Sequence, residues 1–192
     1  MLKKFRRLLK RLWLPITLRY WPLARLWYRL WGLKLEGQPS DEVWYFAFGA
    51  NMNNSVFLER RKMSQKEWRV GRIKDYRLRF NLEGHPKGKA APANIEPFPG
   101  EEVWGILYLI TRLEMVWLNS TEGVPGWRYR PVWLEATDMD GVGMEAFSLI
   151  ADGKETDGNP SLRYITLLRE GARAHRLPEH WIRKLDNVRP AE

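Results

Sequence analysis

The stretch of residues 45–53, YFAFGANMN, limits the possible folds most, because an apolar run stops abruptly at Gly49 and Asn51. Glycine and asparagine tolerate backbone angles that most side chains forbid. A buried strand that ends in such a turn points successive backbone N–H groups outward, where they can hold an anionic or carbonyl oxygen. The alternative is an ordinary strand-to-helix turn, in which Asn51 or Asn53 caps a helix over residues 55–61. This stretch alone leaves both interpretations open.

The positive charge of the chain is concentrated at its N-terminal end. Residues 1–40 contain ten Lys or Arg side chains and one acid, which accounts for all of the net charge of +9 in the 192-residue sequence. The other residues are electrically balanced, so the basic composition is no evidence for a nucleic-acid-binding face on them. We therefore divide the chain into a basic, Trp-rich amphipathic leader, residues 1–40, and a body, residues 41–192, and expect no nucleic-acid partner.

The leader has the spacing of short amphipathic helices. Apolar residues recur three or four positions apart over residues 2–13 and again over residues 23–33, opposite basic side chains. Pro15 and Pro22 interrupt the pattern, which predicts two or three short helices and not one long helix. In the second segment the apolar side is expected to consist of Leu23, Leu26, Trp27, Leu30 and Trp31.

The leader suits the surface of a membrane better than its interior. A window long enough to span contains Arg19, Arg25 and Arg29, and each central arginine costs about 2.5 kcal/mol or more on insertion. Tryptophan and tyrosine suit the headgroup zone, and each Lys or Arg near anionic lipid contributes about 1 kcal/mol. We expect residues 1–35 to bind an anionic membrane surface or a membrane protein partner. Docking of the same face on the protein's own body, or on another partner, remains the alternative.

The body alternates strand and helix patterns and predicts an α+β fold of about five or six strands. A short strand over residues 93–96, a turn over 97–100 and a strong strand over 102–110 follow one another. Two later strands are expected to pair around a turn at residues 138–141. The other expected strands are 44–48, 70–73, 76–81, 128–136 and 143–150, and the other expected helices are 111–118, 161–174 and one from 177.

Glu122 is the side chain best suited to proton transfer. It follows a predicted helix and precedes Gly123, Pro125 and Gly126, among mostly apolar neighbours. A carboxyl group in such a rigid, partly desolvated loop is a candidate acid or base near neutrality. The alternative is a glutamate on a surface loop, which is the commoner environment for this residue type.

The sequence offers no metal-ligand set. There is no cysteine, and the three histidines have no ligand spacing, because His175 and His180 are separated by Pro178. We expect surface histidines, no metal and no cofactor.

Several linked motifs resemble those of the gamma-glutamylcyclotransferase-like family. The family has a YFAYGSNM-type loop, a G-VWG-LY strand, an EG turn followed by tyrosine, and a PS-x-x-Y … GA … LP helical tail. Here these read YFAFGANM, EEVWGILY, EGVPGWRY and NPSLRY … EGARAHRLPEHW. The resemblance covers nearly all of residues 43–187 in the same order, and residues 1–40 lie outside it.

The resemblance implies a small mixed β-barrel flanked by helices, with one pocket. It makes Glu122 the catalytic acid and base, and places Tyr164 and Tyr129 beside the substrate. The loop that holds the glutamyl head group, largely through main-chain groups, falls on Tyr45, Phe46, Ala47, Phe48, Gly49, Ala50 and Asn51. Two of these positions depart from the family, because Phe48 replaces a tyrosine and Ala50 a serine. Each change removes a hydroxyl group.

The implied reaction is the release of 5-oxoproline and a free amine from a gamma-glutamyl amide, without a cofactor. We therefore expect a cytoplasmic enzyme held peripherally at a membrane by its leader, with a small gamma-glutamyl substrate. Two alternatives remain at this point. One is a non-catalytic ligand-binding module of the same fold, in which Phe48 and Ala50 have changed the ligand. The other is a membrane-docking or partner-docking protein driven by its leader.

Overall fold

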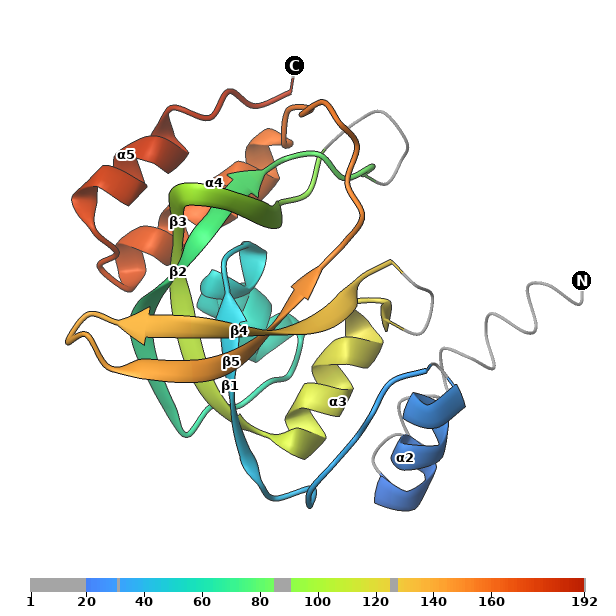
Figure 1. Cartoon of the computed structure of the whole chain (residues 1–192). Coiled ribbons are helices and arrows are strands. Elements are labelled where there is room, and N and C mark those ends of the chain that lie inside the picture. The colour runs from blue at the N-terminus through green and yellow to red at the C-terminus, as the bar shows by residue number, and fades with distance from the viewer. Residues whose placement is uncertain (1–19, 31, 85–90, 125–127, 192) are drawn as a thin grey trace, which may run out of the picture.

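The computed structural model describes residues 20–30, 32–84, 91–124 and 128–191, and within these residues five strands close into a barrel (Figure 1). The strands are β1 (Glu42–Ala47), β2 (Glu67–Arg79), β3 (Asn94–Thr111), β4 (Arg130–Asp138) and β5 (Gly143–Ile150). Their order around the barrel is β1-β3-β2-β4-β5, with β1 parallel to β5 and the other neighbours antiparallel. The prediction of a small mixed β-barrel with helices is confirmed.

Strands β2 and β3 form a long antiparallel pair, and here the predicted boundaries are wrong. The pairing runs from Glu67 opposite Leu109 to Arg79 opposite Asn94 and is interrupted once, where Asp75 (φ 59°) faces residues 98–101 of β3, which pair with no residue of β2. Residues 97–100, predicted as a turn, lie within β3, although residues 98–100 fall in this interruption of the pairing. Pro97 is accommodated because it lies directly beside the interruption, where a missing N–H disturbs the ladder least.

Aromatic side chains fill the barrel next to the end of β1. Phe46, Phe57, Tyr108 and Phe147 are fully buried, and the rings of Phe57 and Tyr108 stack with centroids 4.2 Å apart. Each of these large rings buries a large apolar area in the core. Because β1 lies in this packed core, the turn that follows it has a fixed position.

The turn after β1 consists of η1 (Ala50–Met52), a 3₁₀ turn, and η2 (Ser55–Arg60), a π-helix at the position of the predicted helix 55–61. Asn53 performs the capping role, because its Oδ1 accepts hydrogen bonds from the N–H and the hydroxyl of Ser55, at 3.0 and 2.7 Å. Asn51 does not cap. Its side chain lies in the cavity described below.

Three helices cover the barrel. Helix α3 (Arg112–Thr121) begins directly after β3 with a capping box between Thr111 and Glu114. Helices α4 (Leu162–Ala174) and α5 (Glu179–Asp186) lie together at one end of the barrel (Figure 1). Helix α4 presses on η1 at Gly171, where an added Cβ would lie 2.7 Å from the backbone carbon of Met52. The strands and α4 therefore hold the turn after β1 from two sides.

Helix α2 (Trp21–Leu30) belongs to the leader and packs against the body. Ala24 and Tyr28 are buried, and the Asn119 Nδ2 of α3 donates a hydrogen bond of 2.6 Å to the Tyr28 hydroxyl. The leucines predicted for the apolar side, Leu23, Leu26 and Leu30, are exposed instead. Trp27, from the same predicted side, is partly buried against the core, so the docked face overlaps the predicted face only at its edge. The predicted helix over residues 2–13 lies outside the described residues, as does Trp31.

Candidate active site

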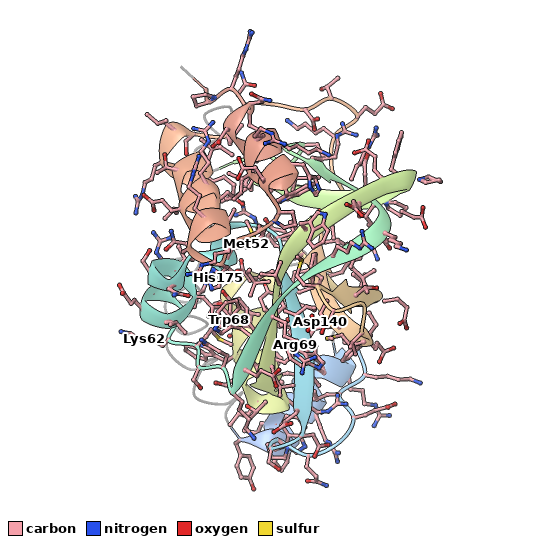
Figure 2. All side chains as sticks on the ribbon, turned by 90° about the vertical axis from the view of Figure 1, so that its left-hand side faces the viewer. Met52, Lys62, Trp68, Arg69, Asp140 and His175 are labelled. Atoms are coloured by element: carbon pink, nitrogen blue, oxygen red, sulfur yellow. The ribbon has the colours of Figure 1, made fainter. Side chains whose placement is uncertain are left out.

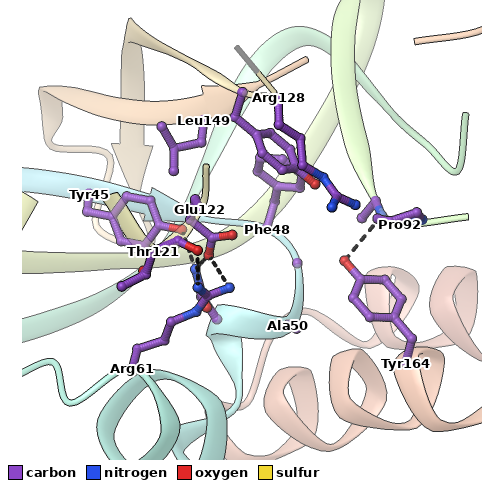
Figure 3. A pocket seen from close by; sticks show the side chains of 14 residues that line it. Tyr45, Phe48, Ala50, Arg61, Pro92, Thr121, Glu122, Arg128, Leu149 and Tyr164 are labelled. Atoms are coloured by element: carbon purple, nitrogen blue, oxygen red, sulfur yellow. Dashed lines mark hydrogen bonds and ion pairs between the residues drawn. The ribbon is translucent and has the colours of Figure 1, made fainter. Parts of the chain in front are cut away.

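A cavity of about 290 Å³ lies where β1, η1 and the end of α3 meet the first turn of α4 (Figure 3). It brings together most of the residues predicted for the site, from four separate segments of the chain. These are Tyr45, Phe48, Gly49, Ala50, Asn51, Glu122, Tyr129 and Tyr164. Phe46 and Ala47, predicted with them, do not line the cavity. Their side chains are buried, and the Phe46 carbonyl accepts a hydrogen bond from the Ser148 hydroxyl.

The Glu122 carboxylate is held at one of its two oxygens. Glu122 is the C-cap of α3, and its Oε1 lies 2.7 Å from Arg61 Nη2 and 2.9 Å from Asn51 Nδ2. The Oε2 atom has no hydrogen-bond partner among the residues that the structure describes. The side chain is partly shielded from water, with 16% of it exposed. The arrangement leaves one carboxylate oxygen available on the cavity side (Figure 3).

Asn51 links Glu122 to Tyr45. Its Nδ2 also donates to the Tyr45 hydroxyl at 2.9 Å, and this bond crosses a buried part of the site. Burial raises the pKa of the Tyr45 hydroxyl, and the nearby Glu122 carboxylate raises it further. Tyr45 therefore stays protonated at neutral pH, and its own hydrogen is free to be donated.

Tyr164 reaches the cavity from the first turn of α4. Its hydroxyl accepts a hydrogen bond from the N–H of Ala93 at 3.1 Å. Burial raises the pKa of the Tyr164 hydroxyl, so this group also stays protonated. With the Ala93 N–H bonded to its oxygen, the hydroxyl can direct its hydrogen to a ligand. Figure 3 shows Tyr164 and Glu122 on opposite sides of the cavity.

Gly49 is required for space and not for its backbone angle. Its φ is −114°, which other residues adopt, although the sequence suggested an unusual conformation. A Cβ at this position would lie 3.1 Å from the Tyr164 hydroxyl oxygen, inside the usual contact distance. The absence of a side chain allows the turn to approach Tyr164 closely.

Two arginines that were not predicted from the sequence, Arg61 and Arg128, line the cavity. Arg61 pairs with Glu122, whereas Arg128 is exposed and lies 6.0 Å from the centre of the Tyr129 ring. No carboxylate among the described residues pairs with Arg128. The only signal for Arg61 in the sequence was the basic run of residues 60–62, which is equally typical of an exposed helix end. The other lining residues not predicted are Pro92, Ala93, Thr121 and Leu149.

His175 and His180 lie away from this cavity, and His85 lies outside the described residues. His175 is buried, contrary to the prediction of a surface residue, and its Nδ1 lies 3.0 Å from the Gly171 carbonyl. Figure 2 shows His175 beside Trp68, and the two rings lie edge-to-face with their centroids 4.8 Å apart. Its role is in packing. Within the described ranges, no group of three or more Asp, Glu or His side chains is placed to hold a metal ion.

Comparisons with known proteins agree with this architecture. Residues 102–185 match the model of the AIG2-like family. The chain is 28% identical over 162 residues to a gamma-glutamylcyclotransferase from Bos taurus, which covers 81% of this chain and 84% of the relative. It is also 28% identical over 160 residues to the gamma-glutamyl cyclotransferase gliK of Aspergillus fumigatus, covering 70% of this chain and 58% of that one.

The fold also matches solved structures. A structure described as a gamma-glutamyl cyclotransferase superposes with a TM-score of 0.73 and 24% identity, over 79% of this chain and 90% of the other. In the part of the chain that is described, no helix has the length and apolar character needed to cross a bilayer.

Proposed function

Because this chain belongs to the gamma-glutamylcyclotransferase-like family, we propose that it releases 5-oxoproline and a free amine from a gamma-glutamyl amide. The observation that carries the proposal is the meeting of Glu122 with the turn after β1. Asn51 of that turn and Glu122 are 71 residues apart in the chain, yet their side chains are 2.9 Å apart. A carboxylate, protonated tyrosines and a backbone turn around one small cavity suit a proton-transfer reaction on an amide.

The substrate brings its own nucleophile. The α-amine of the glutamyl group attacks the γ-carbonyl carbon, which closes a five-membered ring, and the bond between that carbon and the leaving nitrogen breaks. Holding the chain folded back uses the large rate advantage of intramolecular attack. Overall, the ring nitrogen loses two protons and the leaving amine gains two. We assign this shuttle to Glu122, which ends in its starting state, so no cofactor is consumed.

The negative charge on the carbonyl oxygen needs hydrogen-bond donors during this attack. We assign the role to the N–H groups of the turn at residues 48–51, together with the hydroxyl hydrogen of Tyr164. The remaining predicted contacts, Tyr45 and Tyr129, would then surround the glutamyl head group.

The test uses mass spectrometry to measure the formation of 5-oxoproline from a panel of gamma-glutamyl amides. We expect turnover by the wild-type chain and a loss of about 100-fold or more in Glu122→Gln, because the amide cannot accept the proton. The matched control is Glu59→Gln, which changes an exposed glutamate of η2. Turnover retained in Glu122→Gln would refute the assigned role. No 5-oxoproline from any amide would refute the activity.

We also propose that the leader holds the enzyme at an anionic membrane surface. Helix α2 leaves Leu23, Leu26 and Leu30 exposed along one side although its opposite side is docked. Arg25 and Arg29 lie on the same helix, and residues 1–19 add seven more basic side chains. Exposed leucines next to a concentrated positive charge favour the interface of anionic lipid.

Vesicle sedimentation tests this attachment with the full chain. Phosphatidylserine-containing vesicles should retain the wild-type protein, pure phosphatidylcholine vesicles should retain less, and added salt should weaken binding. Changing the three exposed leucines of α2 to serine should release the protein. Leu162→Ser, at an exposed leucine of α4, is the control. Undiminished binding of the triple variant would contradict the proposal.

A further inference from the structure

The position of Glu122 is electrostatically unfavourable. As the C-cap of α3 it lies at the end of the helix where unpaired carbonyl groups and the negative pole of the helix dipole gather. Carboxylates are favoured at the opposite end of a helix. A carboxylate in this place therefore needs a cation to hold it.

Arg61 is that cation, and it satisfies both groups at once. Its Nη1 donates to the Thr121 carbonyl at 2.9 Å, and its Nη2 pairs with Glu122 Oε1 at 2.7 Å. The backbone of Arg61 is fixed in turn, because its carbonyl accepts a hydrogen bond of 2.8 Å from Trp117 Nε1. The Arg61 guanidinium therefore lines the cavity, but its Nη1 and Nη2 atoms bind groups of the protein itself.

Both donors around Glu122 bind the same oxygen. Oε1 receives Arg61 and Asn51, whereas Oε2 has no partner within the described part of the chain. An oxygen that already accepts two hydrogen bonds, one of them charge-assisted, is the poorer acceptor for a further proton. We propose that Arg61 is a positioning residue, which holds Glu122 by Oε1 so that Oε2 alone exchanges protons with the substrate.

This proposal rests on the proposed function and makes a separate kinetic prediction. Arg61 acts on Glu122 and not on the substrate, so its loss should lower kcat and leave KM near the wild-type value. A misplacement of about 1 Å can cost about 100-fold in rate, and we expect a fall of that size in Arg61→Ala. Arg61→Lys should recover part of the lost kcat, because lysine keeps the positive charge beside Glu122. The recovery should be incomplete, because an ammonium lacks the planar fork that bonds Thr121 and Glu122 together.

The experiment compares full-length Arg61→Ala, Arg61→Lys and Arg60→Ala by 5-oxoproline release. Arg60 is the matched control, because it is the adjacent arginine and is exposed. Guanidinium chloride, at concentrations far below those that unfold the chain, should restore part of the kcat of Arg61→Ala and should not activate Arg60→Ala. Thermal unfolding checks that each variant is folded. A raised KM with unchanged kcat, or a folded Arg61→Ala that guanidinium does not rescue, would overturn the proposal.

Crystal structures separate this inference from the proposed function. A wild-type chain without 5-oxoproline release would refute the function, and the orientation of Glu122 in Arg61→Ala would still decide the positioning role. We expect the carboxylate to leave its wild-type orientation there. An unchanged Glu122 in that variant would overturn the role of Arg61 whatever the activity.

Discussion

Removing one hydroxyl group tests whether α2 is an integral part of the folded body. Tyr28→Phe keeps the buried ring and deletes the hydroxyl that accepts the 2.6 Å bond from Asn119 Nδ2. Asn119 is 1% exposed, so water has little access to replace the lost acceptor. A buried donor left without a partner costs about 1–3 kcal/mol. For a chain of this size, each kcal/mol lowers Tm by about 2–4 °C.

Thermal unfolding by circular dichroism measures this effect. We expect Tm to fall by about 4–8 °C for a 2 kcal/mol loss, and Tyr20→Phe, at a tyrosine that is 62% exposed, to melt like wild type. Equal melting of Tyr28→Phe and wild type would refute the docking of α2 on α3. The result also decides how to truncate the chain. A deletion up to residue 38 would expose Asn119, whereas a deletion of residues 1–19 keeps the docked helix.

Three further changes test the site and its frame. Gly171→Ala should cost about 1–3 kcal/mol and lower turnover, because its Cβ would press on the turn after β1; Gly143→Ala, with no atom within 4 Å, is the control, and equal melting of the two would contradict the packing. Asp138→Asn should lower Tm at neutral pH. The N–H of Val142, followed by the bonds from Arg69 and Asp140, holds the pKa of Asp138 below its ordinary value, so its stabilisation is present above about pH 4 and is lost as pH falls through the lowered pKa. A Tm difference that persists at the lowest pH would contradict this assignment. Phe48→Tyr restores the hydroxyl of the related loops and should lower KM by up to about tenfold, as one hydrogen bond allows; an unchanged KM would mean that this hydroxyl does not contact the head group.

The predictable part of the fold had local signals in the sequence. The hairpin of β4 and β5 was predicted from a turn between two apolar runs, and Arg130 does pair with Ile150. The continuous strand β3 was not predicted, because Pro97 and Pro99 mark a turn by local rules. β3 pairs with β2 on both sides of an interruption at residues 98–101, opposite Asp75, so the local turn signal marks a break in the pairing and not the end of the strand.

The site was partly predictable for the same reason. Glu122 and the turn at residues 45–53 carried recognisable local patterns, but nothing local showed that Asn51 would bind Glu122. Arg61 was missed because its two acceptors lie about 60 residues later in the chain. Only the closed barrel brings the end of η2 beside the end of α3.

Helix α2 shows a different limit. Hydrophobicity ranked Leu23, Leu26 and Leu30 as the buried side, whereas the structure buries Ala24 and Tyr28. Ala24 is small enough to be buried completely, and the Tyr28 hydroxyl accepts a hydrogen bond from Asn119. The docked face of α2 is therefore determined by side-chain size and by hydrogen bonding. Neither property can be predicted from the spacing of apolar residues in the sequence.

Product analysis in water enriched in oxygen-18 tests the central claim most directly. If the α-amine of the substrate is the nucleophile, wild-type protein will convert a gamma-glutamyl amide to 5-oxoproline that contains no heavy oxygen. Water would instead yield glutamate that carries oxygen-18 in its γ-carboxylate. Unlabelled 5-oxoproline that disappears in Glu122→Gln is the result we predict. Labelled glutamate as the first product would contradict cyclisation and the role that we assign to this cavity.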